Sequence, residues 1–417
     1  MSTYQIKQNN SNISTLAKYI DLKTFVITII LVSFGLVSIY SATSASEPEF
    51  TTFFRQLLFA SIGVGVMLIV ANIPTHYLKL FSIPLYVITN LLLIVVLFFG
   101  TTVYGTTGWL HIGSWSVQPA EFSKITLLLV IARHLSKKGN TVNNVYDFGI
   151  LMLYFLVPFV LINIQPDFGT SLVLLVMVFG ILYWGGFDGF YLLAIIEMCA
   201  MFIASLSSPY VAIIVGGISA ITLLLFRKRL TVYAITLALL IGVAFAAPEF
   251  YEHLQPHQQN RINVFLNPGS DPQGVGYNVM QSLLAVGSGG VIGKGFMQGT
   301  LTQLRYIPMQ WTDFIYSVSA EEFGLIGSTI VLFFLLSLVY RGISIAGKCK
   351  EDFNTVIAFG ISTVFVFHIV INVGMVLGVC PVMGITLPFV SYGGTSLLTN
   401  MAFAGLLMNI HRNNNRQ

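Results

Sequence analysis

Hydrophobic and polar positions divide this chain into long apolar runs separated by short polar segments. Runs of about 18 or more apolar residues are long enough for a transmembrane helix. A closed barrel needs alternating strands of about ten residues, and these runs are continuous, which favours helices. We therefore predict about twelve transmembrane helices, near residues 24–43, 55–73, 77–99, 119–135, 148–164, 168–185, 188–206, 209–226, 231–248, 323–345, 353–378 and 387–410.

The same pattern predicts the division of the chain. Two blocks of helices, 24–248 and 323–411, flank a long loop at 249–322, with polar tails at 1–23 and 412–417. A loop of this length in a compact protein is usually functional or disordered. Its aromatic and aliphatic residues argue against disorder, and NVMQSLLAV within it predicts a short amphipathic helix.

Lys and Arg side chains predict the orientation, because cytoplasmic loops carry an excess of them. With the N-terminus inside, fifteen of the twenty Lys and Arg residues fall on the inner side. The outer side holds Arg55 and, in the long loop, Arg261, Lys294 and Arg305, whereas Lys124 lies inside a span. Long loops cross the membrane regardless of charge, so Arg55 alone counts against the fifteen. We therefore expect both termini in the cytoplasm and the long loop outside.

Composition agrees with a membrane protein. Of the 417 residues, 55% are hydrophobic and 9% are charged, where soluble proteins carry about 25% charged residues. Three cysteines at unrelated spacings argue against a disulfide framework or a zinc site. The polar start of the chain has no short apolar region with a cleavage site after it, so we expect the first apolar run to be a retained anchor.

Ionisable residues inside or beside spans mark candidate function. Glu121 and Lys124 share one helical face, and can form either a pair that fixes packing or a substrate contact. Lone His368 on an apolar helix is more typical of packing. Asp167 lies between two spans at their outer end, where it can be a helix N-cap or a functional group.

The stretch YIPMQWTDFIYSVSAEEFG, residues 306–324, places three acidic residues at the outer rim of a span. Asp313 can cap the next helix or lie in its first turn, and Glu321 falls on the same helical face further along. Acidic side chains together with the basic residues of the long loop suggest a site that handles protons and an anionic group.

The glycine-rich segment GSGGVIGKG, residues 287–295, is not a nucleotide-binding loop. The phosphate loop requires G-x-x-x-x-G-K-[ST], whereas Ser288 and Gly295 stand at the first and last of these positions. We expect these glycines to permit tight turns or the close approach of a bulky ligand.

Several blocks of the chain, in order, resemble the SEDS family (shape, elongation, division and sporulation), which includes RodA, FtsW and SpoVE. The blocks are VQPAEFSK (117–124), QPDFGT (165–170), RINVFLNPGSDPQGVGYNVMQSLLAVGSGGVIGKGF (261–296), TDF (312–314), AEEFG (320–324) and NVGMVLGVCPVMGITLPFVSYGGTS (372–396). The glycine-rich segment is more similar to RodA than to FtsW. The resemblance implies an all-α polytopic membrane protein of ten spans, so we expect an added pair of helices between 188 and 248.

The resemblance also implies a peptidoglycan glycosyltransferase that joins lipid II units by a β-1,4 bond, with inversion and release of undecaprenyl pyrophosphate. Asp313 of TDF matches the catalytic residue of the family. The other site residues that we infer are Arg261, Lys294, Lys124, Glu121 and Asp167 for the substrate and its pyrophosphate, with Glu321, Glu322, Thr312, Ser391, Gly393 and Gly394 in support.

The family further implies a divalent cation, Mg²⁺ or Mn²⁺, for which Asp313, Asp167 and Glu321 are candidate ligands. Expected partners are lipid II, the nascent glycan, a class B penicillin-binding protein and other proteins of cell elongation, without nucleic acid. The expected location is the bacterial cytoplasmic (inner) membrane, with the site outside. The alternatives are a lipid II flippase, a non-catalytic scaffold, or an FtsW-like role in division.

Overall fold

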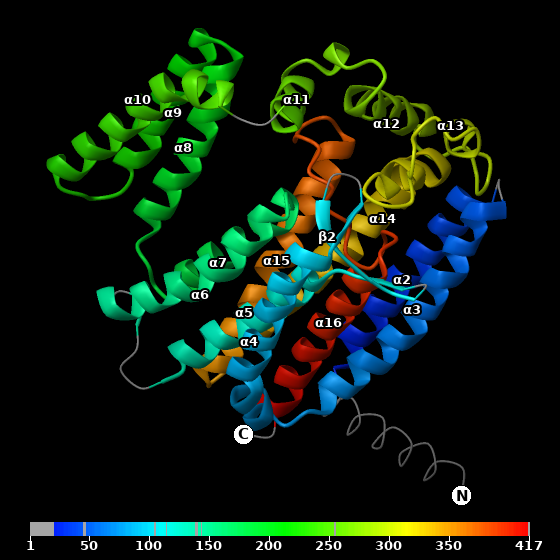
Figure 1. Ribbon diagram of the computed structural model, residues 1–417, viewed down its shortest axis with the longest axis horizontal. Coiled ribbons are helices and arrows are strands. Elements are labelled where there is room, and N and C mark those ends of the chain that lie inside the picture. The colour runs from blue at the N-terminus through cyan, green and yellow to red at the C-terminus, as the bar shows by residue number, and fades with distance from the viewer. Residues whose placement is uncertain are drawn as a thin grey trace, which may run out of the picture. The chain divides into compact units, whose positions relative to one another are not determined.

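The computed structural model describes residues 21–44, 47–103, 106–113, 115–137, 141–142, 144–253 and 256–415. Residues 1–20 of the predicted N-terminal tail and residues 416–417 lie outside this set. The described chain is mostly helical, with one small sheet (Figure 1). It forms two compact units, one of residues up to Gly185 and from Asn278 onward, the other of Gly186–Tyr277.

The first unit contains most of the helices: α2 (Leu22–Thr43), α3 (Glu47–Asn72), α4 (Thr75–Phe99), α5 (Pro119–Leu135), α6 (Val145–Ile164), α7 (Phe168–Trp184), α13 (Thr300–Gln303), α14 (Ile315–Ala346), α15 (Asp352–Val376) and α16 (Gly394–Asn414). The second unit contains α8 (Gly189–Ser207), α9 (Pro209–Leu224), α10 (Leu230–Glu252), α11 (Pro256–Leu266) and the 3-10 helix η1 (Pro268–Ser270). Helix α12 (Val275–Gly289) begins at the end of the second unit and continues in the first, and confirms the helix predicted from NVMQSLLAV.

The membrane character is confirmed. Among the residues that the structure describes, eight helices are long and apolar enough to cross a membrane, and α7 and α9 are shorter apolar helices. Each of the predicted spans contains a helix, and α5 has the predicted bounds. The chain is therefore an all-α polytopic membrane protein.

Three predicted helix starts are wrong, and two of them lie beside the signature motifs. Helix α3 begins at Glu47 rather than 55. Helix α14 begins at Ile315 rather than 323, so the last part of the predicted loop 249–322 is helical. Its Glu321 and Glu322 are buried and accept hydrogen bonds from Lys294 and from Ser41 of α2, contacts that a hydropathy pattern does not reveal. Helix α16 begins at Gly394 rather than 387, because residues 377–393 form an irregular segment despite their apolar character.

Helix α16 lies beside α3, and α14 packs against both α15 and α2 (Figure 1). Apart from Leu398, residues 395–410 of α16 are buried, polar Thr399, Asn400 and Asn409 included. A helix buried on every side occupies the centre of a large bundle. The core of the first unit is therefore built around α16 and α15.

A three-stranded antiparallel sheet joins α4 to α5. It consists of β1 (Thr101–Val103), β2 (Thr106–Ile112) and β3 (Trp115–Val117) in sequence order. In β2 and β3, Leu110 pairs with Val117. The backbone amide of Thr107 donates to the carbonyl of Gln165 at 3.2 Å, which ties the sheet to the segment before α7.

The second unit has its own core. Buried Phe190, Met201, Leu223 and Leu240 pack together from α8, α9 and α10. Glu197 of α8 accepts a hydrogen bond from the hydroxyl of Thr222, which gives this carboxylate a structural partner. This unit holds the segment in which we predict the added helix pair, and that assignment stays a prediction.

Candidate active site

The TDF motif lies in a turn directly before α14. The N-cap of this helix is Phe314, which has no side-chain capping bond, so Asp313 precedes the helix and does not cap it. Trp311 and Phe314 are buried, whereas Asp313 and Thr312 are partly exposed. The hydroxyl of Thr312 donates to Oδ1 of Asp313 at 2.9 Å and orients the carboxylate.

The backbone of this turn is fixed by Asn372 of α15. Its fully buried Nδ2 donates to the carbonyl oxygen of Asp313 at 2.8 Å and to that of Ile385 at 2.7 Å. One amide thus joins the turn that carries Asp313 to the irregular segment before α16.

That irregular segment is held on its other side by Gln56 of α3. The Gln56 side chain donates to the carbonyl of Ser391 at 3.3 Å and accepts from the amide of Gly393 at 3.2 Å. The hydroxyl of Ser391 accepts from the amide of Leu387, and the amide of Tyr392 donates to the carbonyl of Trp311 at 2.8 Å. Ser391 and Gly393 therefore belong to the scaffold that positions the TDF turn.

Close packing also explains why residue 394 is a glycine. A Cβ at this position would lie 2.5 Å from the ring of Phe59 of α3. Real Cβ atoms do not approach so closely, so any larger residue here would displace the Phe59 ring, and glycine lets α16 start close to α3.

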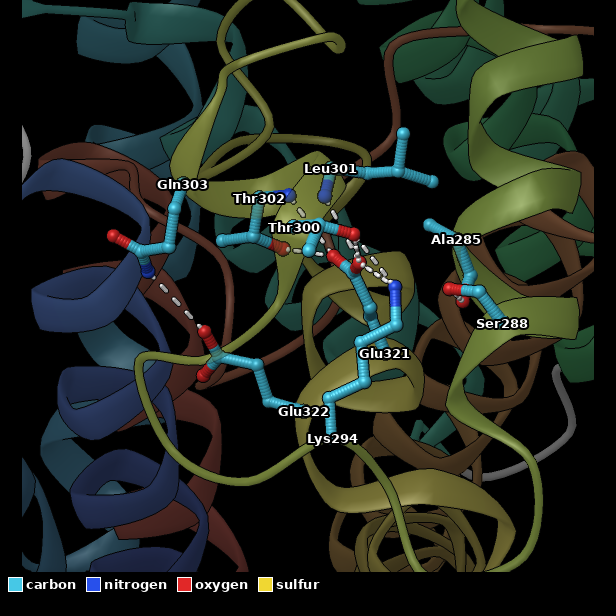
Figure 2. Close-up of polar contacts among 9 residues, drawn as sticks. All are labelled: Ala285, Ser288, Lys294, Thr300, Leu301, Thr302, Gln303, Glu321 and Glu322. Atoms are coloured by element: carbon cyan, nitrogen blue, oxygen red, sulfur yellow. Dashed lines mark hydrogen bonds and ion pairs between the residues drawn. The ribbon is translucent and has the colours of Figure 1, made fainter.

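Glu321 is the centre of a second cluster (Figure 2). Its Oε1 accepts from Nζ of Lys294 at 2.7 Å and from the amide of Leu301 at 2.9 Å. Its Oε2 accepts from the amide and the hydroxyl of Thr302 at 2.9 and 2.7 Å. Nζ of Lys294 also donates to the hydroxyl of Thr300 at 2.8 Å. We call Lys294, Thr300–Thr302 and Glu321 the loop clamp.

The glycine-rich segment pairs with α14 where that helix is interrupted. Gly324 has φ 66° and ψ −164°, which breaks the helical ladder. The amides of Lys294 and Gly295 donate to the carbonyls of Glu321 and Glu322, and the amides of Leu325 and Ile326 donate to Gly290 and Val291. In a membrane, backbone groups freed by such a break need partners inside the protein, and this segment provides them.

The glycines allow this pairing. A Cβ at Gly289 would lie 2.0 Å from the carbonyl oxygen of Ala320, and a Cβ at Gly293 would lie 2.2 Å from that of Glu322. The expected close approach is therefore to the backbone of α14, rather than to a ligand.

The side chain of Glu322 points toward Gln303 rather than into the loop clamp (Figure 2). Its Oε1 accepts from the hydroxyl of Ser41 in α2 and, at 3.4 Å, from Nε2 of Gln303. Glu322 therefore joins α14 to α2 and α13.

Asp167 is the N-cap of α7, where Oδ1 accepts from the amide of Thr170 at 3.0 Å. Its Oδ2 accepts from Nε2 of Gln118 at 2.7 Å. Burial raises the pKa of the Asp167 carboxyl above its usual range, and the bonds from Thr170 oppose part of that rise. Nearby, Lys124 and Glu121 form a buried pair with Nζ 2.8 Å from Oε2.

The described residues do not form a metal site held by the protein. They contain no group of three or more His, Cys, Asp or Glu side chains arranged to bind an ion. Both oxygens of Glu321 are occupied by the loop clamp, and both oxygens of Asp167 accept hydrogen bonds. The donor set therefore does not fit a resident ion, and the divalent cation stays a prediction.

The structure brings Asp313, Thr312, Ser391 and Gly393 into one scaffold, whereas Arg261 lies in α11 of the second unit. Sequence reasoning missed Asn372, Gln56 and Tyr392 as positioning residues. Asn372 could have been found from the sequence, since it is an amide side chain at the start of a signature block within an apolar run.

Comparisons with known proteins agree with this geometry. The family model described as a cell cycle protein, of FtsW, RodA and SpoVE, matches residues 21–215 and 210–416. The peptidoglycan glycosyltransferase MrdB of Escherichia coli (strain K12) is 32% identical over 387 residues, which are 92% of each chain. Stage V sporulation protein E of Bacillus subtilis (strain 168) is 32% identical over 94% of this chain and 97% of its own.

Solved structures show the same fold. A chain of a peptidoglycan synthase complex that coordinates polymerization and crosslinking matches with a TM-score of 0.72 and 27% identity, over 95% of this chain and 98% of its own. The rod shape determining protein RodA of Thermus thermophilus matches with a TM-score of 0.62 and 25% identity, over 94% and 97%. The family model, the identities and the coverage together show that this chain belongs to the FtsW, RodA and SpoVE family, the SEDS proteins.

Proposed function

We propose that this chain polymerises the glycan strands of peptidoglycan from lipid II, with Asp313 as the general base. The relatives MrdB and RodA of Treponema pallidum are named peptidoglycan glycosyltransferases, and both are 32% identical to this chain over more than 90% of its length. The chain is accordingly a peptidoglycan glycosyltransferase, and its own residues supply the mechanism.

The proposed reaction uses Asp313 as its base. Its carboxylate takes the proton of the acceptor 4-hydroxyl while the hydroxyl oxygen attacks the anomeric carbon of the donor. The new C–O bond forms as the bond from that carbon to the lipid pyrophosphate breaks. A single displacement converts the α linkage into a β linkage, as in other inverting transfers.

The observation that carries this proposal is the fixed turn around Asp313. Asn372 holds its carbonyl, Thr312 holds its carboxylate, and the carbonyl of Trp311 accepts from Tyr392. A partly exposed acid held by so many contacts is positioned for chemistry, since misplacement of a base by about 1 Å can cost about 100-fold in rate.

We place the site on the outer face of the bacterial cytoplasmic membrane. The distribution of Lys and Arg supports this orientation. The likeness to RodA supports a role in cell elongation, and the matching synthase complex supports a crosslinking class B penicillin-binding protein as the partner.

A lipid II flippase is the second candidate, and the buried Glu121–Lys124 pair favours it. Charges buried within a bundle are typical of transport pathways. Detergent micelles separate the two functions, because they leave no membrane to cross. The purified chain with its partner should form glycan polymer from lipid II in micelles. A chain that moves lipid II across vesicle membranes, yet never polymerises it in micelles, would contradict the glycosyltransferase proposal.

A further inference from the structure

The proposed reaction releases a pyrophosphate, whose negative charge needs cations beside it. Two basic residues suggested by sequence are already neutralised within the first unit. Lys294 is paired with Glu321 in the loop clamp, and Lys124 is buried against Glu121. A cation for the pyrophosphate must therefore come from another basic residue close to Asp313.

Arg55 lies near the start of α3 and is exposed. Its neighbour Gln56 bonds to Ser391 and Gly393, which places Arg55 beside the residue between them, Tyr392. The amide of Tyr392 in turn donates to the carbonyl of Trp311, two residues before Asp313. Arg55 therefore borders the turn that carries the proposed base.

The partner of Arg55 does not neutralise it. Burial raises the pKa of the Tyr392 phenol, and the nearby guanidinium of Arg55 offsets part of that rise. The phenol stays neutral at physiological pH, unlike the carboxylates that face Lys294 and Lys124. Among the side chains that the structure describes, no acidic group forms an ion pair with Arg55. One phenol oxygen also leaves most of the five N–H donors of a guanidinium available.

The distribution of Lys and Arg along the chain also singles out Arg55. Arg55 is the one basic residue that the predicted topology places in a short outer loop. Such loops are depleted of Lys and Arg, so a cation retained there calls for a function. A guanidinium also matches phosphate oxygens with two parallel hydrogen bonds.

We propose that Arg55 binds the pyrophosphate of the lipid-linked donor and stabilises the charge that develops on it as the glycosidic bond breaks. This role rests on the proposed function, and it assigns a substrate-binding residue outside the long loop.

Undecaprenyl pyrophosphate, the released product, is the probe. Its binding to the purified complex is measured by competition with lipid II, for wild type and for Arg55→Ala, Arg55→Lys and Tyr392→Phe. Arg55→Ala should weaken binding about 10- to 100-fold, the loss of hydrogen bonds to a charged group. Arg55→Lys should lie between, and Tyr392→Phe, which keeps the cation, should stay within about threefold of wild type.

Three results would overturn the proposal. One is unchanged binding by Arg55→Ala; another is equal weakening by Tyr392→Phe, which would mean that the phenol hydroxyl matters as much as the charge of Arg55. The third is a matching loss for undecaprenol, which lacks phosphate. Arg55→Lys carries the test if the alanine variant does not fold. A wild-type complex that forms no polymer contradicts the proposed function itself, and that result is separate from any effect of Arg55.

Discussion

The side-chain amide of Asn372 donates to the carbonyl oxygens of Asp313 and Ile385, at 2.8 and 2.7 Å. One buried side chain thereby fixes the turn of the proposed base relative to the segment that precedes α16. Neither carbonyl belongs to a helix, so each relies on tertiary partners in a bundle with little water. The geometry at Asp313 is therefore a property of α15 as much as of its own loop.

Replacement of Asn372 should reduce the rate more than substrate binding. Asn372→Ala leaves two buried carbonyls without this donor, and an unsatisfied buried group costs about 1–3 kcal/mol. We expect kcat to fall about 10- to 100-fold with KM within about threefold. The matched control is Asn354→Ala, a buried asparagine near the other end of α15. Equal losses in both variants would show that Asn372 has only a general structural role.

The loop clamp should contribute to stability far more than a surface pair. Glu321 is fully buried, and removal of one partner of a buried pair costs about 3–5 kcal/mol. We expect Glu321→Ala to lower the thermal midpoint strongly in detergent. Glu351→Ala breaks the exposed pair with Lys79 at 2.9 Å and should cost about 0–1 kcal/mol. Similar midpoints for the two variants would contradict a structural role for the clamp.

The pairing of the glycine-rich segment with α14 can be tested within one helix. Gly289→Ala puts a methyl group against the carbonyl of Ala320 and should cost about 1–3 kcal/mol. Gly287 lies in the same helix with open space at its Cβ position, so Gly287→Ala should be neutral or stabilising by about 1 kcal/mol. Thermal unfolding compares them. A stable Gly289→Ala variant would show that the close approach is not required.

Asp167 should make stability depend on pH in a defined direction. Burial raises its folded-state pKa, so its ionisation costs stability at neutral pH. That cost disappears as the pH falls through the raised pKa. Asp167→Asn keeps an acceptor for Thr170 and does not ionise. Wild type should therefore gain stability relative to this variant on acidification from about pH 8 to about pH 4.

The thermal midpoints of wild type and Asp167→Asn, measured across that pH range, show whether the pKa of Asp167 is raised or lowered. Asp167→Ala serves as the control, since it loses the bonds to Thr170 and Gln118 at every pH. A wild type that loses stability relative to Asp167→Asn on acidification would indicate a lowered pKa and contradict this account of Asp167.

Periodicity and hydropathy predicted the helices well where burial in lipid decides the structure. Helix α5 has its predicted bounds, because Pro119 opens it and an apolar run fills it. Periodicity and hydropathy failed where tertiary contacts decide the structure. Residues 315–322 are helical although they end in two acidic residues, since Glu321 and Glu322 find partners in the loop clamp and in α2.

The site was predicted only in part for the same reason. The TDF and SYGG motifs were recognisable as family signatures, and the structure joins them through Tyr392 and Trp311. The clamp between Lys294 and Glu321 links residues 27 positions apart, and no local pattern encodes such a pair. Lys294 was expected to hold pyrophosphate, and its bond to Glu321 gives it a structural partner instead.

The central claim is that Asp313 is the general base, and the single most direct test is polymerisation of lipid II by Asp313→Asn. Asparagine has nearly the same shape and can accept the Thr312 hydrogen bond, but it cannot take a proton. We predict polymer formation at least ~100-fold below wild type, with lipid II binding within about threefold in the same preparation. Polymer formation at the wild-type rate by Asp313→Asn would contradict the assignment.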